Sequence, residues 1–208
     1  MGVPGFSWMW LRGRCPECRE PIGRWVLGVE LATGLVFAAV GWRVGWSVTL
    51  VPMMALGAGL VAISTVDLWY SRIPTLFVYT TGVGAGAGLV LATATTDDGD
   101  TGALVGALIG AGTYLVVLGG MWLVSPRAMG FGDVRLGVVL GLVVGWVGWS
   151  EARPIDGPLS LTFAALMGGS LLGSVVGLVL MARRRRNQPF PFGPALSLGA
   201  LVAILAAV

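Results

Sequence analysis

The sequence predicts an all-α fold, a polytopic membrane helical bundle of about seven transmembrane helices. Three observations lead to this prediction. Of the 208 residues, 56% are hydrophobic, and the mean hydropathy is +0.86. Only 11% are charged, whereas soluble domains carry about 25%. Long apolar runs are separated by short polar stretches. Together these features argue against a soluble enzyme, a disordered protein and a nucleic-acid binder.

Seven segments meet or approach the roughly 20 apolar residues that a helix needs to cross the hydrocarbon core. They cover residues 25–42, 46–66, 73–95, 102–124, 134–149, 159–181 and 193–208. The fifth and seventh are short, as expected for helices buried in a bundle or with interfacial ends. Glycine and alanine occur throughout these segments, and in lipid such small residues let helices approach closely.

Taken in order, the spans differ in the residues at their ends. The first carries Glu30 in its first turns, and the second ends at Asp67. The third begins near Pro74, because proline is common where a helix starts. The fifth opens after Asp133, and the last opens at Gly193. We expect a short cytoplasmic N-terminal segment over residues 1–24 and one transmembrane domain over residues 25–208.

The positions of the arginines predict the orientation. With the N-terminus in the cytoplasm, only Arg43 and Arg153 of the 13 basic residues fall on the outer side, so the positive-inside rule favours this topology. The net charge of +3 therefore reflects orientation. The basic run at 183–186 directly follows a span and is interpreted as a cytoplasmic stop, so we expect membrane lipid and no nucleic acid among the partners.

The sequence contains no histidine and two cysteines. The lack of histidine excludes Ser-His-Asp, Cys-His and histidine-ligated metal chemistry. Cys15 and Cys18 supply two ligands, whereas structural zinc wants four. We favour a structural remnant for this CxxC pair over a partial metal site completed by carboxylates or by a second chain, and we expect no cofactor.

Three carboxylates lie in or at the edge of apolar segments: Glu30, Asp67 and Asp133. A charge in this position costs about 2.5–3.5 kcal/mol on insertion scales, so such residues are functional candidates. Two aspartates at one membrane depth cannot both ionise comfortably when they are close. One can then activate a water while the other polarises a carbonyl, which is aspartic-protease chemistry. Alternatively, Asp67 is a surface residue at a helix end and Asp133 is a helix N-cap.

The residues around Asp133 fit the catalytic interpretation. Gly130 and Gly132 flank it closely, and we expect them to allow the backbone turn into the span and to leave room for a substrate. Glu30 is interpreted as a supporting residue that packs or hydrogen-bonds across the bundle.

The motifs in this chain resemble those of the type IV prepilin leader peptidase family. Residues 130–133 (GFGD) match the GxGD signature of intramembrane aspartic proteases, and Asp67 precedes Ile73-Pro74 as in that family. The stretches at 12–18 (RGRCPEC) and 191–194 (PFGP) match in family order. The resemblance implies cleavage of prepilin or pseudopilin leaders on the cytoplasmic side of the bacterial plasma membrane, typically after glycine. It also implies that Asp67 and Asp133 are the catalytic pair.

The chain departs from fuller family members at its front end. Those members begin with another transmembrane helix and a cytoplasmic segment that carries a first CxxC pair, so we expect an N-terminally short member. That region is associated with N-methylation of the new pilin terminus. The resemblance therefore implies the peptidase activity for this chain and leaves the methyltransferase activity in doubt. Two other functions remain open: a small transporter that relays protons or cations through Asp67 and Asp133, and a non-catalytic family member.

Overall fold

The computed structural model describes residues 14, 20, 23–95, 101–126, 129–183 and 191–208. In these ranges it is a bundle of seven α-helices, which confirms the predicted fold class. They are α2 (Arg24–Val44), α3 (Leu50–Tyr70), α4 (Thr75–Thr95), α5 (Gly102–Val124), α6 (Phe131–Gly148), α7 (Asp156–Arg183) and α8 (Gly193–Ala207). The first six are long and apolar enough to cross a membrane, and α8 is shorter at 15 residues.

Each predicted span corresponds to one of these helices, and the differences lie at the ends. α6 begins at Phe131, three residues before the predicted start, so Asp133 lies inside the first turn of the helix. α7 begins at Asp156, also three residues earlier than predicted. α3 continues past Asp67 to Tyr70. Asp67 therefore lies in the last turn of its helix.

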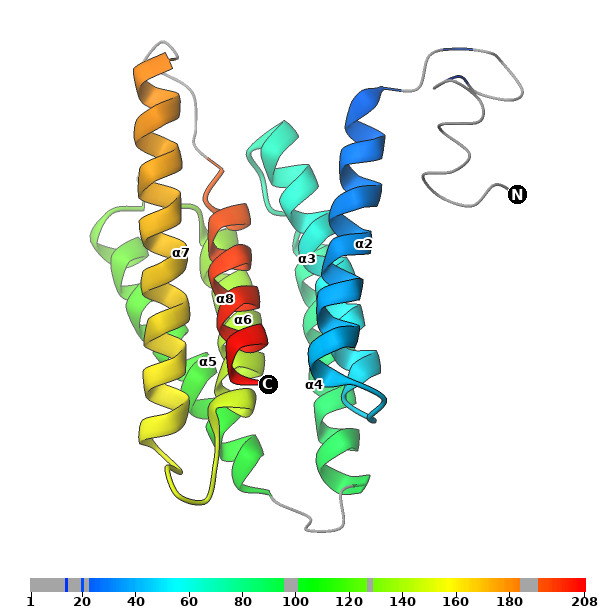
Figure 1. The fold of residues 1–208 in the computed structure, drawn as a ribbon. Helices are drawn as coiled ribbons and strands as arrows, with labels where there is room; N and C mark the ends of the chain where they lie inside the picture. The colour runs from blue at the N-terminus through cyan, green and yellow to red at the C-terminus, as the bar shows by residue number, and fades with distance from the viewer. Residues whose placement is uncertain (1–13, 15–19, 21–22, 96–100, 127–128, 184–190) are drawn as a thin grey trace.

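The helices run side by side, with α2 and α7 at opposite edges of the bundle in the view of Figure 1. α8 lies between these two edges, and α6 lies behind it. α6 contacts α4, α5, α7 and α8. α2 has little buried surface and packs mainly against α3. The helix α6 is thus the most enclosed of the six long helices, whereas α2 presents most of its surface to the outside.

Glycine allows the closest packing in the bundle, between α5 and α6. A Cβ atom on Gly106 would lie 2.7 Å from the carbonyl oxygen of Gly145. A Cβ atom on Gly110 would lie 2.8 Å from the Cα of Gly145. Both distances are below ordinary van der Waals contact, so larger residues would force the helices apart. This packing joins the first half of α5 to the second half of α6, so the two helices run antiparallel in close contact.

Candidate active site

Asp67 is buried at the end of α3, with 4% of its surface exposed. One turn later, Ser71 ends the helix in the left-handed region, with φ of 49° and ψ of 41°. The Ser71 N–H donates a hydrogen bond of 2.7 Å to the carbonyl oxygen of Asp67. A left-handed residue is a common way to end a helix, although glycine usually occupies that position. The alternative that Asp67 is a surface residue is wrong, because Asp67 itself is buried although the residues after it in the helix are exposed.

The Asp67 carboxylate is held by the first residue of α8. The backbone N–H of Gly193 donates a hydrogen bond of 3.0 Å to Oδ2 of Asp67. The first N–H groups of a helix have no partner inside the helix, so they are available to an anion. The positive end of the α8 dipole also favours a negative charge at this position. The PFGP stretch therefore supplies a donor directly to the candidate catalytic carboxylate.

Asp133 lies in the first turn of α6. The N-cap of this helix is Gly130, and no side-chain hydrogen bond caps it, so the alternative that Asp133 is the N-cap is wrong. The Asp133 N–H donates a 3.1 Å bond to the Gly130 carbonyl oxygen. Oδ1 of Asp133 is buried and has no hydrogen-bond partner among the described residues. Since buried polar atoms are normally paired, this oxygen is available to a ligand.

The two aspartates line one cavity of about 1120 Å³. Its walls come from the end of α3 and the loop after it, the end of α5, the segment that leads into α6, and Phe192 before α8. The two carboxyl groups also interact electrostatically. A cavity lined by a carboxyl group from each of two helices can hold a peptide bond and a water. The remaining lining residues are Ser71, Arg72, Ile73, Gly120, Met121, Val124, Ser125, Pro126, Met129, Gly130 and Gly132.

Ile73 joins three of the sequence motifs. A Cβ atom on Gly132 would lie 2.9 Å from the Cβ of Ile73. A Cβ atom on Gly193 would lie 3.3 Å from Cδ1 of Ile73 and 2.8 Å from Oδ2 of Asp67. The isoleucine therefore packs between the two glycines, and each glycine leaves the space that this contact needs. These contacts place the GFGD and PFGP stretches around the end of α3.

The reason for the glycines beside Asp133 differs from the prediction. We expected the backbone freedom of Gly130 and Gly132 to allow the turn into the span, and their small size to leave room for a substrate. Gly130 has φ of −74° and ψ of 143°, which any residue adopts, and Gly132 is helical. Their role is spatial, because a Cβ atom on Gly130 would lie 3.3 Å from Oδ2 of Asp133. The expected room around the carboxylate is therefore present, whereas the special backbone turn is not.

The other predicted site residues lie away from the two carboxylates or outside the described part of the chain. Pro74 directly precedes α4, and its carbonyl oxygen accepts a 3.2 Å bond from Val78 N–H. Oε2 of Glu30 is buried and has no hydrogen-bond partner in the described residues, so this oxygen makes no bond across that part of the bundle. Cys15 and Cys18 lie outside the described residues. Within those residues, no group of three or more Cys, Asp or Glu side chains is arranged to hold a metal ion.

Sequence reasoning missed several contributors to the site. It placed Gly193 in a motif but gave no sign that its N–H binds Asp67. It assigned no role to Ser71, Arg72 or Phe192, all of which line the cavity. A serine after an apolar helix carries no signal for a left-handed conformation. An arginine shortly after a span is already explained by the positive-inside rule.

The fold and the cavity together define a class of protein: a multi-pass membrane protein with two aspartates that line one cavity at the end of its helical bundle. Residues 54–182 match the model of the type IV leader peptidase family, and residues 1–44 match the bacterial peptidase A24 N-terminal domain. The chain belongs to the type IV leader peptidase family.

Individual relatives agree with this assignment. A prepilin leader peptidase/N-methyltransferase of Aeromonas hydrophila is 34% identical over 98% of this chain and 66% of its own length. A protein of the same description from Stutzerimonas stutzeri is 32% identical with the same coverage. A type 4 prepilin-like proteins leader peptide-processing enzyme of Escherichia coli is 36% identical over 97% of this chain and 69% of its own length. The chain thus spans about 66% of the length of the first two. No solved structure matches.

Proposed function

We propose that this chain is a membrane aspartic endopeptidase that removes the leader peptide of type IV prepilins or pseudopilins, with Asp67 and Asp133 as its catalytic residues. The observation that carries the proposal is the cavity that these two carboxyl groups share. Membership of the family and the names of the relatives support the substrate class. The proposal is confined to the peptidase activity and does not include N-methylation.

The hydrogen bonding of the two carboxyl groups supports different roles for them. Oδ2 of Asp67 accepts the Gly193 N–H, and a bond from a donor favours the charged form of a carboxyl group. The Asp133 carboxyl group also meets the backbone N–H groups of Gly130 and Asp133, but its Oδ1 has no partner in the described residues, so this oxygen can hold a proton and donate it to a ligand. Asp67 is then the general base, and Asp133 is the acid that binds the scissile carbonyl oxygen.

The reaction follows from these roles. A water loses one proton to Asp67 while its oxygen forms a bond to the scissile carbonyl carbon. The proton of Asp133 stabilises the oxyanion that develops on the carbonyl oxygen. The amide nitrogen then takes the proton from Asp67, the carbon–nitrogen bond breaks, and the two peptides separate. This sequence consumes one water and uses neither histidine nor a cofactor.

The placement of the site fits a substrate that is itself anchored in the membrane. Asp67 is in the last turn of α3 and Asp133 is in the first turn of α6, so both lie at the end of the bundle. We propose that this end faces the cytoplasm, because the arginine distribution favours that orientation. In this arrangement residues 25–208 form the peptidase domain, and the charged leader of the substrate remains outside the bilayer.

The test is cleavage of a pilin-like precursor that carries glycine at the leader junction, co-expressed with this chain in a membrane. Asp67→Asn and Asp133→Asn keep the side-chain size nearly unchanged, and each is expected to abolish cleavage. Glu151→Gln, on an exposed loop between α6 and α7, is the matched control and is expected to cleave normally. Wild-type cleavage by either aspartate variant would refute the catalytic pair. An inserted wild-type protein that never cleaves the precursor would favour the transporter or the non-catalytic alternative.

A further inference from the structure

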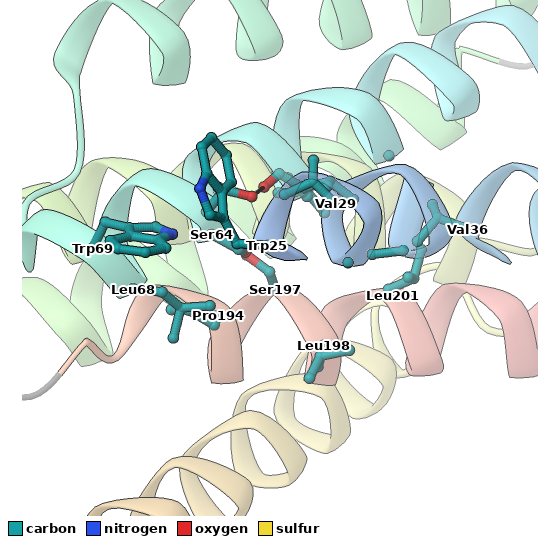
Figure 2. A pocket seen from close by; sticks show the side chains of 16 residues that line it. Trp25, Val29, Val36, Ser64, Leu68, Trp69, Pro194, Ser197, Leu198 and Leu201 are labelled. Carbon is teal, nitrogen blue, oxygen red and sulfur yellow. Dashed lines mark hydrogen bonds between the residues drawn. The ribbon is translucent and has the colours of Figure 1, made fainter. Parts of the chain in front are cut away.

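A second cavity lies between α2, α3 and α8, apart from the one that contains the aspartates. Figure 2 shows this groove, whose side chains are almost all apolar and which has a volume of about 410 Å³. Ligand pockets usually have volumes of roughly 300–1,000 Å³. The cavity touches the catalytic region through neighbours in sequence: Leu68 follows Asp67, and Pro194 follows Gly193. The groove therefore lies against the pair of helices whose contact holds Asp67.

The groove is elongated. Along α3 it extends from Trp69 to Gly57, a rise of about 18 Å at 1.5 Å per residue. A volume of about 410 Å³ spread over this length suits one extended hydrocarbon chain.

One polar atom at the end of the groove near the active site lacks a partner. Ser197 is 5% exposed, it lines the groove, and its Oγ has no hydrogen-bond partner among the described residues. It lies one helical turn beyond Gly193, or about 6 Å further into the bundle. Buried hydroxyl groups are normally paired. This hydroxyl therefore indicates a ligand that brings an acceptor to this depth.

Two tryptophans mark the same end of the groove. Trp25 from α2 and Trp69 from α3 pack edge to face, with their ring centroids 5.6 Å apart, and both line the groove (Figure 2). Tryptophan is enriched where the membrane meets the headgroup layer. Next to this pair lie the hydroxyl-bearing residues Ser64, Thr65 and Ser197, and beyond them the walls are apolar as far as Val36 and Leu201. This order along the groove fits a ligand that has a polar group just beneath the headgroup layer and an apolar part deeper in the membrane.

We propose that the groove binds one acyl chain of a phospholipid, taken from the leaflet at the aspartate end of the bundle. The ester carbonyl of the chain accepts a hydrogen bond from the Ser197 hydroxyl, and the hydrocarbon lies along α3. The bound chain fills the space between α2, α3 and α8, and so it stabilises the α3–α8 contact at which Gly193 holds Asp67. Lipid binding does not depend on the proposed peptidase function, whereas the effect of the lipid on cleavage rests on it.

The experiment compares two alanine-to-phenylalanine variants on α2. Ala32 is exposed and lines the groove, so Ala32→Phe fills it from the side that faces the lipid. Ala38→Phe makes the same change at an exposed position of the same helix that does not line the groove, and is the matched control. Phospholipid retained by the purified proteins is measured by native mass spectrometry. We expect wild type and Ala38→Phe to retain one phospholipid and Ala32→Phe to lose it.

A second variant tests the hydrogen bond. Ser197→Ala removes one bond to the ester carbonyl and is expected to lower the affinity for the phospholipid about five-fold. A photo-crosslinking residue in place of Leu198, which also lines the groove, identifies the occupant in the membrane. We expect crosslinks to phospholipid. Crosslinks to a prepilin precursor instead, or equal lipid retention by Ala32→Phe and wild type, would overturn the proposal.

Cleavage assays separate the lipid effect from the peptidase function itself. Wild type stripped of lipid is expected to lose cleavage and to regain it with a long-chain phospholipid but not with a six-carbon one. Wild type that cleaves at full rate after complete delipidation would overturn the effect on cleavage and leave the peptidase function intact. Wild type that never cleaves, while Ala32→Phe still loses its phospholipid, would overturn the peptidase function and leave the lipid site intact.

Discussion

Gly193→Ala is the substitution whose effect on catalysis follows most directly from the geometry. The new Cβ atom would lie 2.8 Å from Oδ2 of Asp67. An ordinary contact needs at least 3.4 Å, so the carboxylate must move by about 0.6 Å. The present N···O distance of 3.0 Å then lengthens by up to about 0.6 Å, towards the limit at which the hydrogen bond is lost.

The lost bond sets the expected size of the effect. A hydrogen bond to a charged group contributes about 1.5–3 kcal/mol, and each 1.36 kcal/mol corresponds to a factor of ten in rate. We therefore expect the kcat of Gly193→Ala to fall about 10- to 150-fold. KM is expected to change little, because the substitution displaces the base and leaves most of the cavity wall in place. The assay is cleavage of a prepilin precursor over a range of concentrations, with enzyme in membranes or detergent.

A matched control separates this effect from a general loss of stability. Gly168→Ala introduces the same methyl group on α7, where nothing lies within 4 Å of it, and it is expected to leave kcat unchanged. Helix content and membrane insertion are measured for both variants. If Gly193→Ala is inserted and cleaves at the wild-type rate, the Gly193–Asp67 bond has no role in catalysis and the reasoning is refuted.

Three further predictions concern the packing that supports the site. Gly110→Ala is expected to lower the free energy of unfolding by about 1–3 kcal/mol, because its Cβ atom overlaps α6. Gly112→Ala on the same helix meets nothing within 4 Å and should leave the stability of the protein unchanged. Thermal unfolding in detergent compares the pair, and equal melting temperatures would contradict the close-packing argument. Trp146→Phe removes the 3.0 Å bond from Nε1 to Thr93 Oγ1 and should cost about 1 kcal/mol in the same assay, with cleavage unaffected. Arg135→Gln loses a 2.9 Å bond to α4 and the position of its guanidinium over an aromatic ring; a loss of about 1 kcal/mol is expected, and an unchanged melting temperature would show that neither contact contributes.

The elements of the fold were predictable because hydropathy is a local property of the chain. A run of about 20 apolar residues predicts a span wherever it packs, and each of the seven predicted segments is a helix. The helix ends were harder to place. α6 begins at Phe131 because a helix can start within the GFGD stretch, whereas hydropathy alone placed its start after Asp133.

The candidate site was predictable in its residues and not in its contacts. Asp67 and Asp133 were singled out because acids are costly at the edge of an apolar segment. The role predicted for Gly130 and Gly132 was wrong in part. The space left by their missing side chains matters, whereas their backbone conformation is one that any residue adopts. The hydrogen bond from Gly193 joins residues 126 positions apart. No local pattern around either residue encodes that pairing.

The sequence alone determined the number and order of the helices, and it singled out two aspartates. The tertiary structure decided which helix faces meet: that α8 holds Asp67, that the two carboxylates share a cavity, and that Ser197 lies in an apolar groove. The physical reason is the lipid environment. Helices that are apolar on every side carry no amphipathic stripe to mark their inner face, so in this bundle close steric fit between small residues and individual hydrogen bonds decides the packing.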